Sequence, residues 1–545
     1  MRFLAILLWF FLLSAGLCAQ SGFTLPLKEK VFLTGNYGEI RPNHFHAGLD
    51  FRTDVKKHLP IYCIGDGYVS RIKVGTHGYG KVLYITHPNG KVSVYGHQFG
   101  FNDSIKKYVE AAQDMLETFE VELFPRPGEL RVKQGELIGY TGNTGDTEGP
   151  HLHFEIRDEK SEVPLNPLRF LNLADTVAPV ITAVTLLGHD NDFIKRLSLK
   201  DTADILRVPI SFGIGVQCHD LEQIPGNSNN VNRIEILIDS NLFYRAVLDS
   251  IPFDMTRYVN CYAWRKKFKL RGQEEKYDKL QKCYKEKNND LPIYQVIRGD
   301  GFINLEDTLL HELQVIVYDF YNHSRSMKIK VKRVPASRMK PLIKLPVNCL
   351  EPWQRITPAY HLEMLEKTLY TDVRMTDSMH NEWLYFNADG YNLPLHKSCI
   401  VALKAPEHLK KWPEKLCIAD VHGAYYGGSY DKGWISTTTK SFGRYKVAID
   451  TVPPTVKFVR SKSKQKKTCK AGGVISFRVS DALSGIGSFK LFVNDKFQLA
   501  EYEHKTGLIF FDVTDKTPKG QITVRLELSD KKENRAQSSV KLVVE

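Results

Sequence analysis

The 545-residue sequence predicts a mainly β fold: an N-terminal antiparallel β-sheet domain with an inserted helix, followed by β-sandwich, Ig-like modules. Aromatic residues make up 11% of the chain, and aromatic side chains favour strands. Short alternating or apolar runs separated by turn residues recur along the sequence. A hydrophobic content of 42% is that of a folded globular protein, and the length corresponds to roughly three to four domains.

Residues 1–19 have the pattern of a secretory signal peptide. A short basic start precedes an apolar run, Phe3 to Leu13, and a cleavage point follows Ala19. That run is too short to cross a bilayer, and no later segment reaches about 18 uninterrupted apolar residues. Lipid anchoring at Cys18 is not expected, because Leu17 stands where a lipobox needs a small residue. We therefore expect an exported protein of the periplasm or cell envelope.

The formal net charge of +13 favours acidic partners. Nucleic acid, a membrane surface and an anionic cell-wall polymer all fit this charge, and export argues against nucleic acid. The basic run Arg460–Lys470 is interpreted as a solvated loop.

The cysteines that follow residue 19 show no CxxC motif and no dense framework. An oxidising compartment permits disulfides. Cys261–Cys283 and Cys399–Cys417 are the pairs that would close local loops, and isolated buried thiols are expected for most of the others.

Residues 23–173 form the first predicted domain. The stretch VLYITHPNGKVSVYGH shows two alternating strands joined at Asn89-Gly90, a strong hairpin signal. Ser93, Tyr95 and His97 share one face of the second strand. Residues 103–119 then have helical spacing and are expected to form the inserted helix.

A second polar row lies in the stretch GPHLHFEIR, residues 149–157. Side chains alternate across a strand, so His151 and His153 point to the same face, with Glu155 and Arg157 further along it. Leu152, Phe154 and Ile156 point to the opposite face and are expected to be core. The two imidazoles are therefore either solvated or directed at something that imidazole binds.

Three β-rich modules are expected after residue 176: a β-sandwich module over 177–335, a β-rich module over 336–449 and a β-sandwich module over 450–545. The first and the last open alike, with DTVAPV and DTVPPT, and close with a strand, an Asp and a turn containing Asn. The closing residues are Asp319 and Asn322 in one module, and Asp530 and Asn534 in the other. We interpret this pattern as a weak internal repeat.

Five histidines and an aspartate gather in the first domain. The residues are His44, His46, Asp50, His97, His151 and His153. His and Asp suit zinc, and a catalytic zinc takes three protein ligands and leaves a fourth position open. In a straight strand, residues four apart lie about 13 Å apart, so the chain between His46 and Asp50 must bend, and Gly48 permits this. His151 and His153 are about 6.6 Å apart along a strand, so one can be a ligand while the other stands beside the open position.

The motifs HxxxD, YxH and GPHLHFE, in this order, resemble those of the lysostaphin/LytM-type zinc metallopeptidases over about residues 30–170. GNTG before the last motif and NPL after it strengthen the resemblance. Members of that family fold as a small antiparallel β-sheet with a groove and cut peptide bonds in peptidoglycan. Gln98 replaces the usual leucine after YxH, which should affect packing only, and His44 lies outside the family pattern.

The resemblance implies one zinc ion per chain, with His46, Asp50 and His153 as its ligands. It makes His97 and His151 the catalytic pair: His151 takes or orients the proton of the attacking water, and His97 donates to the developing oxyanion. Tyr95 and Arg41 are candidates to line the groove, and a structural role fits each of them equally well.

The implied activity is that of a secreted zinc-dependent endopeptidase that hydrolyses peptide cross-links of peptidoglycan, with stem peptides as substrate. The alternative is a non-catalytic cell-envelope scaffold or amidase regulator that uses the same fold. A peptidase of protein substrates is the third hypothesis. An envelope protein is a candidate partner for the C-terminal β-modules, whereas neither nucleic acid nor a transmembrane segment is expected.

Overall fold

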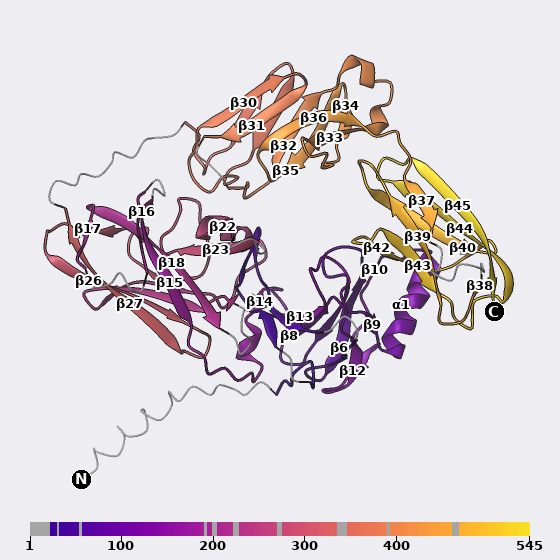
Figure 1. Ribbon diagram of the computed structural model, residues 1–545, viewed down its shortest axis with the longest axis horizontal. Coiled ribbons are helices and arrows are strands. Elements are labelled where there is room, and N and C mark those ends of the chain that lie inside the picture. Colours follow the sequence, from indigo (N-terminus) through magenta and orange to yellow (C-terminus); the bar gives the residue numbers. More distant parts are fainter. Residues whose placement is uncertain are drawn as a thin grey trace, which may run out of the picture.

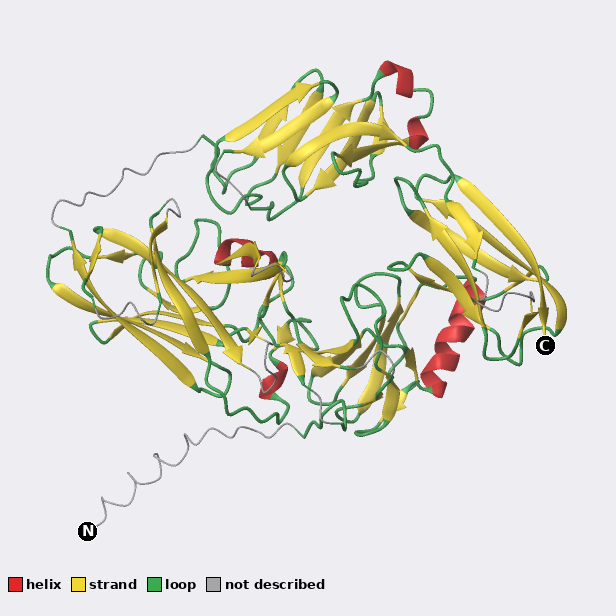
Figure 2. Ribbon diagram, viewed as in Figure 1, coloured by secondary structure: helices red, strands yellow, loops and turns green. Residues whose placement is uncertain are grey.

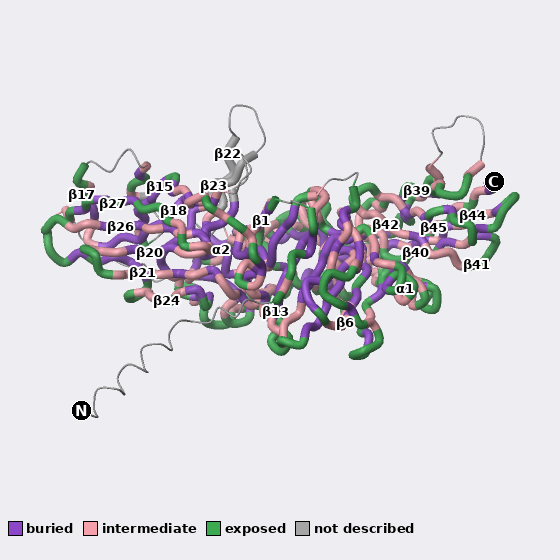
Figure 3. Tube along the Cα trace, turned by 90° about the horizontal axis from the view of Figure 1, so that it is seen from below, coloured by how far each residue is buried: buried purple, intermediate pink, exposed green. Residues whose placement is uncertain are grey.

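A computed structural model describes residues 22–29, 32–53, 57–189, 193–198, 204–221, 228–269, 275–334, 346–389, 393–459 and 468–545. Strands form most of the molecule, which confirms the predicted mainly β fold (Figure 2). Four β-rich units follow one another around a ring, and the last unit returns to the first (Figure 1). Seen from the side, the second, N-terminal and C-terminal units lie side by side in one layer, with buried segments along their strands (Figure 3). No helix in the described ranges is long and apolar enough to cross a membrane.

The N-terminal unit is built on an antiparallel nine-stranded sheet, in the order β1-β4-β13-β8-β7-β6-β10, with β11 beside β6 and β14 beside β13. These strands are β1 (Leu33–Gly35), β4 (Leu49–Arg52), β6 (Gly67–Val74), β7 (Lys81–Thr86), β8 (Lys91–Gly96), β10 (Val121–Leu123), β11 (Arg131–Val132), β13 (His151–Asp158) and β14 (Pro164–Leu165). Two small sheets complete the unit: β5 (Pro60–Tyr62), β12 (Leu137–Tyr140) and β9 (Gly100–Phe101), and β2 (Ile40–Arg41) with β3 (His44–Phe45). A short 3-10 helix, η1, spans Pro167–Arg169. The three apolar residues expected on one face of β13 are fully buried in this unit's core.

The predicted hairpin is confirmed as β7 and β8, which pair antiparallel. Its connection has four residues, 87–90, and of the two predicted turn residues only Gly90 takes a positive φ, of 72°. Asn89 contributes through its side chain, whose oxygen accepts a bond from the backbone N–H of Lys91. The turn is therefore longer than the two-residue loop that the Asn-Gly pair favours.

The inserted helix is confirmed as α1, Asp103–Leu116. Asn102 caps its start by accepting a bond from the backbone N–H of Ile105. The helix ends earlier than predicted because Glu117 adopts a left-handed conformation, with φ 48°. The buried residues of the helix are Ile105, Val109 and Gln113, whereas Met115 in its last turn is 77% exposed.

The second unit consists of two sheets and a short helix, α2 (Val259–Tyr262), preceded by the 3-10 turn η3 (Thr256–Tyr258). One sheet contains β15 (Val180–Leu187), β16 (Phe193–Leu197), β18 (Ser211–Leu221), β19 (Ser228–Asn229), β22 (Ala263–Lys269), β23 (Glu275–Lys282) and β25 (Ile303–Asn304). The other contains β17 (Leu206–Val208), β20 (Arg233–Ile238), β21 (Asn241–Val247), β24 (Tyr294–Ile297), β26 (Leu310–Tyr318) and β27 (Ser324–Arg333).

The third unit also has two sheets, with two 3-10 turns, η4 (Glu407–Leu409) and η5 (Pro413–Lys415). One sheet contains β28 (Trp353–Ile356), β29 (Tyr360–Met364), β32 (Cys399–Lys404), β34 (Ser429–Asp431) and β35 (Trp434–Thr439). The other contains β30 (Met375–His380), β31 (Trp383–Ala388), β33 (Leu416–Asp420) and β36 (Gly443–Ile449).

The C-terminal unit again pairs two sheets. The first contains β37 (Thr455–Phe458), β39 (Val474–Ser480), β42 (Glu501–Glu503) and β43 (Leu508–Asp512). The second contains β38 (Thr468–Cys469), β40 (Ile486–Val493), β41 (Lys496–Phe497), β44 (Gly520–Asp530) and β45 (Arg535–Val544).

The weak repeat seen in the sequence has a structural counterpart in the last hairpin of the second and C-terminal units. Asp319 and Asp530 each accept a bond from the backbone N–H four residues later. The left-handed residue three positions after the Asp is Asn322 in one turn and Glu533 in the other, so the two Asn residues of the pattern are not equivalent. The aspartate, not the Asn, is the shared element of this turn.

Buried side chains of the second and third units form one continuous cluster, which also includes Ile40 and Phe45 of the N-terminal unit. The C-terminal unit has a cluster of its own. The expected module boundaries at 177–335, 336–449 and 450–545 remain predictions, as does the Ig-like character of the modules.

The eight cysteines within the described ranges are free thiols, and seven of them are buried. Neither of the two local disulfides considered from the sequence is formed: Cys261 and Cys283 sit separately in the core of the second unit, and burial raises the pKa of both thiols. The signal peptide over 1–19, Cys18 and most of the basic run, residues 460–467, lie outside the described residues.

Candidate metal centre

Three predicted ligands converge on one point of the N-terminal unit. β4 pairs antiparallel with β13 so that Asp50 lies opposite His153, and His46 reaches the same point from the segment before β4. Asp50 Oδ1 lies 3.0 Å from His46 Nε2 and 2.9 Å from His153 Nδ1, and the two nitrogens are 3.1 Å apart. All three side chains are buried, and together they could hold a metal ion.

The expected bend between His46 and Asp50 is present at Gly48. Glycine is needed here for close approach, because a Cβ at Gly48 would lie 2.2 Å from the carbonyl oxygen of Phe154 in β13. The absence of a side chain thus lets the bent segment bring His46 against β13.

Hydrogen bonds on the far side of each imidazole fix its orientation. His46 Nδ1 donates to the carbonyl of Asn36 at 2.8 Å, which leaves Nε2 directed at Asp50. His153 Nε2 lies 2.8 Å from Glu155 Oε1, which leaves Nδ1 at the centre. Such partners set the tautomer of a metal-binding histidine.

Glu155 is itself held by neighbours that the sequence did not single out for this role. Its Oε2 accepts a bond of 2.6 Å from Arg157 Nε, and Tyr79 donates its hydroxyl to Oε1. Burial alone would raise the pKa of Glu155, but Arg157 and His153 lower it to about 2. The position of Glu155 and Arg157 in the row of His153 was the available signal, whereas nothing in the sequence pointed to Tyr79 or Asn36.

The groups around Asp50 keep its carboxylate ionised. Burial would raise the pKa of Asp50, but His46 and His153 hold it well below its usual range. The second carboxylate oxygen of Asp50 accepts a bond of 2.5 Å from Arg41. Burial would lower the pKa of His153, but its bonds to Asp50 and Glu155 raise it to about 9.

His97 and His151 flank this centre. Their ring centroids are 4.7 Å apart, and His151 Nε2 lies 3.5 Å from Asp50 Oδ1. His97 Nδ1 donates to the carbonyl of Thr144 at 2.8 Å, and His151 Nδ1 donates to that of Gly149 at 2.9 Å. Burial lowers the pKa of His151, and burial with the neighbouring imidazoles lowers that of His97 to about 3. Both rings are therefore neutral at neutral pH, with Nε2 free of a proton.

The other residues named from the sequence have different places in the structure. Tyr95 is fully buried, and its hydroxyl accepts a bond from the backbone N–H of Ile64, so it is structural and does not line the groove. Arg41 lines the groove. His44 is exposed and also lines the groove, but it is not part of the metal cluster. Gln98 is buried, and its amide donates to the carbonyl of Tyr95, as expected for a packing residue.

A groove of about 1320 Å³ runs past the cluster. Arg41, Arg52 and Lys57 line it from the N-terminal unit, and Lys279 lines it from the second unit. Lys279 is held by Glu39 at 2.8 Å. The walls of the groove thus come from two units and carry several cationic groups.

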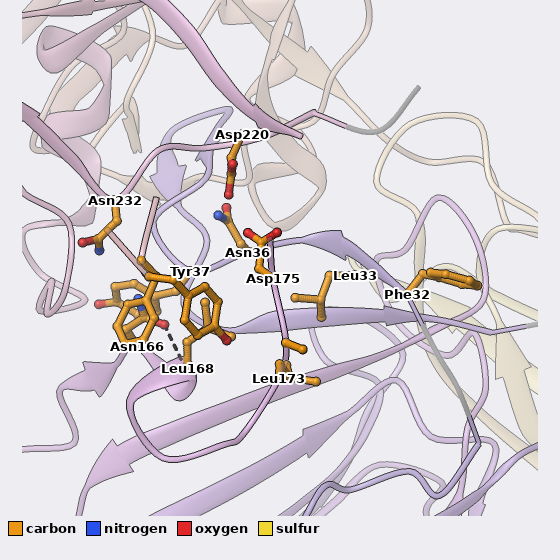
Figure 4. A pocket seen from close by; sticks show the side chains of 13 residues that line it. Phe32, Leu33, Asn36, Tyr37, Asn166, Leu168, Leu173, Asp175, Asp220 and Asn232 are labelled. Atoms are coloured by element: carbon orange, nitrogen blue, oxygen red, sulfur yellow. Dashed lines mark hydrogen bonds between the residues drawn. The ribbon is translucent and has the colours of Figure 1, made fainter. Parts of the chain in front are cut away.

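A smaller cavity of about 90 Å³ lies between the N-terminal and second units (Figure 4). Asn36, Tyr37, Asp175 and Asp220 are among the residues that line it. It has room for several water molecules. Asn36 is also the residue whose carbonyl orients His46, so this cavity lies behind the metal cluster.

Two segments of the chain match models of known families: residues 126–167 match Peptidase family M23, and residues 354–450 match the Zu5-like domain. The N-terminal unit resembles the M23 metallopeptidases. The resemblance predicted from the motifs is thereby confirmed.

Curated relatives align with about a fifth of the chain. The DD-carboxypeptidase/endopeptidase Mpg of Neisseria meningitidis is 29% identical over 123 residues, which cover 23% of this chain and 22% of Mpg. The peptidoglycan DD-endopeptidase ShyB of Vibrio cholerae is 36% identical over 112 residues, 20% of each chain. The alignments thus span about a fifth of these relatives' length.

Solved structures are also similar to part of the chain. The catalytic domain of lysostaphin from Staphylococcus simulans is 22% identical, with a TM-score of 0.19 over 25% of this chain and 87% of that domain. A zinc-containing peptidase from Vibrio cholerae is 24% identical, with a TM-score of 0.21 over 29% of this chain and 41% of that one.

Proposed function

We propose that this protein is an exported, zinc-dependent endopeptidase that hydrolyses peptide cross-links of peptidoglycan. The observation that carries the proposal is the convergence of His46, Asp50 and His153, whose three facing atoms lie 2.9–3.1 Å from one another. The M23 match and relatives named as peptidoglycan DD-endopeptidases support the substrate class.

The donor set suits zinc. Two imidazole nitrogens and one carboxylate oxygen at these separations can each lie about 2.0–2.2 Å from a single ion, which leaves a fourth position open. Bound zinc would lower the pKa of a water molecule and polarise a carbonyl. Asn36 and Glu155 hold the two imidazoles in the required orientation.

His151 is suited to act as a general base. It is neutral, and its Nδ1 proton is engaged by Gly149, so Nε2 can accept a proton from the attacking water. Its Nε2 already lies near the cluster, 3.5 Å from Asp50 Oδ1. Once protonated, the same ring can return the proton to the leaving amine.

In His97, as in His151, Nδ1 carries the proton and Nε2 does not. The role suggested by the sequence, donation to the oxyanion, therefore has to be reconsidered. In its neutral form it donates from Nδ1 to Thr144, and Nε2 can only accept. Donation to an oxyanion would need an imidazolium, which the lowered pKa of His97 disfavours. We therefore assign His97 to accept a hydrogen bond from the reacting water or from a substrate N–H.

The decisive experiment is a digestion of purified cross-linked muropeptides with the zinc-loaded protein, followed by identification of the products by mass. We expect cleavage of the cross-link and none with His153→Ala. If a zinc-loaded, folded preparation leaves every muropeptide intact, the scaffold or amidase-regulator reading replaces this proposal. The complete donor set argues against that reading, and the β-rich units remain a proposed docking surface for an envelope partner.

A further inference from the structure

The C-terminal unit packs against the N-terminal unit, beside α1 and β10 (Figure 1). Phe489 of β40 packs against the core of the N-terminal unit, and Lys490 pairs with Glu117 just after α1. Lys81 Nζ lies 2.7 Å from Glu501 Oε1. Apolar and charged contacts therefore join two units that are more than 300 residues apart in sequence.

At one corner of this interface, three potential metal ligands meet from three separate segments. His77 lies between β6 and β7, Asp146 lies in the loop between β12 and β13, and His504 follows β42. Asp146 Oδ1 is 3.2 Å from His77 Nδ1 and 3.3 Å from His504 Nε2. The two imidazole rings have centroids 4.2 Å apart.

Both oxygens of Asp146 are accounted for. Oδ2 accepts a bond of 2.8 Å from the backbone N–H of Gly78, which turns Oδ1 towards the two imidazoles. One ligand atom from each of the three residues lies within 4.8 Å of the others. Glu503 Oε1 stands 3.9 Å from His504 Nδ1, too far for a hydrogen bond, and this buried nitrogen has no hydrogen-bond partner among the described residues.

We propose that His77, Asp146 and His504 form a second zinc site, which fastens the C-terminal unit to the N-terminal unit. Two imidazoles and a carboxylate are zinc ligands, and water completes a four-coordinate shell. The side chains of His77 and Asp146 are 67% and 57% exposed, so zinc can enter and leave without unfolding either unit. The proposal goes beyond the peptidase assignment and does not depend on it.

The zinc site also bears on the groove, because Asp146 belongs to one of its walls. Thr144, two residues earlier, provides the carbonyl that holds His97. Lys505, next to His504, donates to the carbonyl of Asn143 in the same loop. Zinc bound at Asp146 would therefore hold the C-terminal unit and this wall of the groove together.

The coupling between zinc binding and docking of the C-terminal unit determines how strongly zinc should stabilise the docked arrangement. Zinc that binds only the docked arrangement favours it by a factor of 1 + [Zn]/Kd, which is about 100-fold at 100 times the Kd. Residual binding by the undocked ligands makes this an upper bound.

The test uses the full chain carrying His153→Ala, which removes a ligand of the proposed catalytic centre. Zinc stoichiometry is measured by titration, and hydrogen exchange is followed in segments 143–147 and 503–507. We expect one zinc per chain and a slowing of exchange, approaching 100-fold at saturation, in both segments. Adding His504→Ala or His77→Ala, one from each unit, should abolish both effects.

His408→Ala is the matched control, since His408 is an exposed histidine of the third unit outside the clusters described above. It should bind zinc as its parent does. Unchanged zinc binding in both His504→Ala and His77→Ala, or zinc binding that leaves exchange in the two segments unchanged, would overturn the proposal. Retention of a second zinc by the His153→Ala parent would instead count against the catalytic ligand set. Failure of the second zinc site and failure of the proposed function can therefore be told apart.

Discussion

At the scale of single residues, the centre depends on which nitrogen of each histidine carries the proton. Backbone carbonyls of Asn36, Thr144 and Gly149 accept hydrogen bonds from Nδ1 of His46, His97 and His151, whereas Glu155 binds His153 at Nε2. His153 is thus the one member of this group that presents Nδ1 to the cluster. A carboxylate two residues further along the strand determines that difference.

The first prediction concerns the ligands. His46→Ala, Asp50→Ala and His153→Ala should each remove zinc from the proposed catalytic centre, because each leaves only two of the three donors. Zinc content per chain, measured after dialysis, checks this, and His504→Ala should be added to each variant so that the second site does not contribute. His44→Ala, the exposed neighbour, should keep the metal. Full retention by all three variants would refute the ligand set.

The second prediction separates catalysis from metal binding. His151→Ala should keep zinc and lose about 10²–10⁴-fold in kcat, the range for a missing acid–base group. His97→Asn should also keep zinc and lose turnover, because the hydrogen-bond acceptor at Nε2 is gone. Asparagine is chosen at position 97 because the backbone there has φ 59°, which Asn tolerates better than Ala. Muropeptide turnover checks this against His408→Ala as control, and near-normal rates would refute the role of the residue concerned.

At the scale of elements, the bent segment before β4 and the strand β13 define the site together. Gly48 lies against the backbone of β13 at a distance that no side chain permits. This contact holds His46 over the strand that carries His153. Close backbone packing, and not a turn conformation, is the property on which the centre depends here.

Gly48→Ala should therefore destabilise the protein by about 1–3 kcal/mol, the usual cost of overpacking, and weaken zinc binding as His46 moves. Gly100→Ala is the control, because a Cβ there meets nothing within 4 Å. Urea unfolding and zinc titration of both variants measure the difference. Equal stability of the two would show that the segment before β4 relaxes freely.

The sequence predicted the elements whose signals are local. Each of these signals spans only a few residues of the chain: the alternation in β8 and β13, the helical spacing in α1 and the motif that pairs His46 with Asp50. The partners Asn36 and Tyr79 escaped prediction because one acts through its backbone carbonyl and the other reaches Glu155 from a turn 76 residues away in sequence. Contacts between units, such as Lys81 with Glu501, join residues too distant in sequence to leave any periodic pattern.

At the scale of the whole molecule, the second and third units share a core, and a buried histidine lies at their junction. His396 stacks on Tyr258 of the second unit, with ring centroids 4.1 Å apart. Burial, together with Arg257, Lys397 and Lys440, lowers the pKa of His396 to about 4. Its neutral form is thus the one compatible with this junction.

The pKa of His396 is lower in the folded protein than in the unfolded chain. The stability that neutral His396 contributes to the fold is therefore fully present above about pH 6.5 and is lost as the pH falls towards 4. We expect the free energy of unfolding to fall by about 1 kcal/mol over this pH window, after allowance for the partial contact of His396 with water. His396→Phe keeps the stacking and should flatten this part of the pH profile. Thermal unfolding between pH 4 and pH 7.5 measures it, and an identical profile in the variant would contradict the assignment.

The return of the C-terminal unit to α1 makes their association intramolecular. Tethered partners experience an effective concentration, on the order of millimolar for short flexible linkers, that does not change when the protein is diluted. A free protein that competes for the same face of α1 must overcome this local concentration before it binds. A competitor that succeeds covers that face itself and leaves Phe489 of the C-terminal unit without the apolar surface against which it packs.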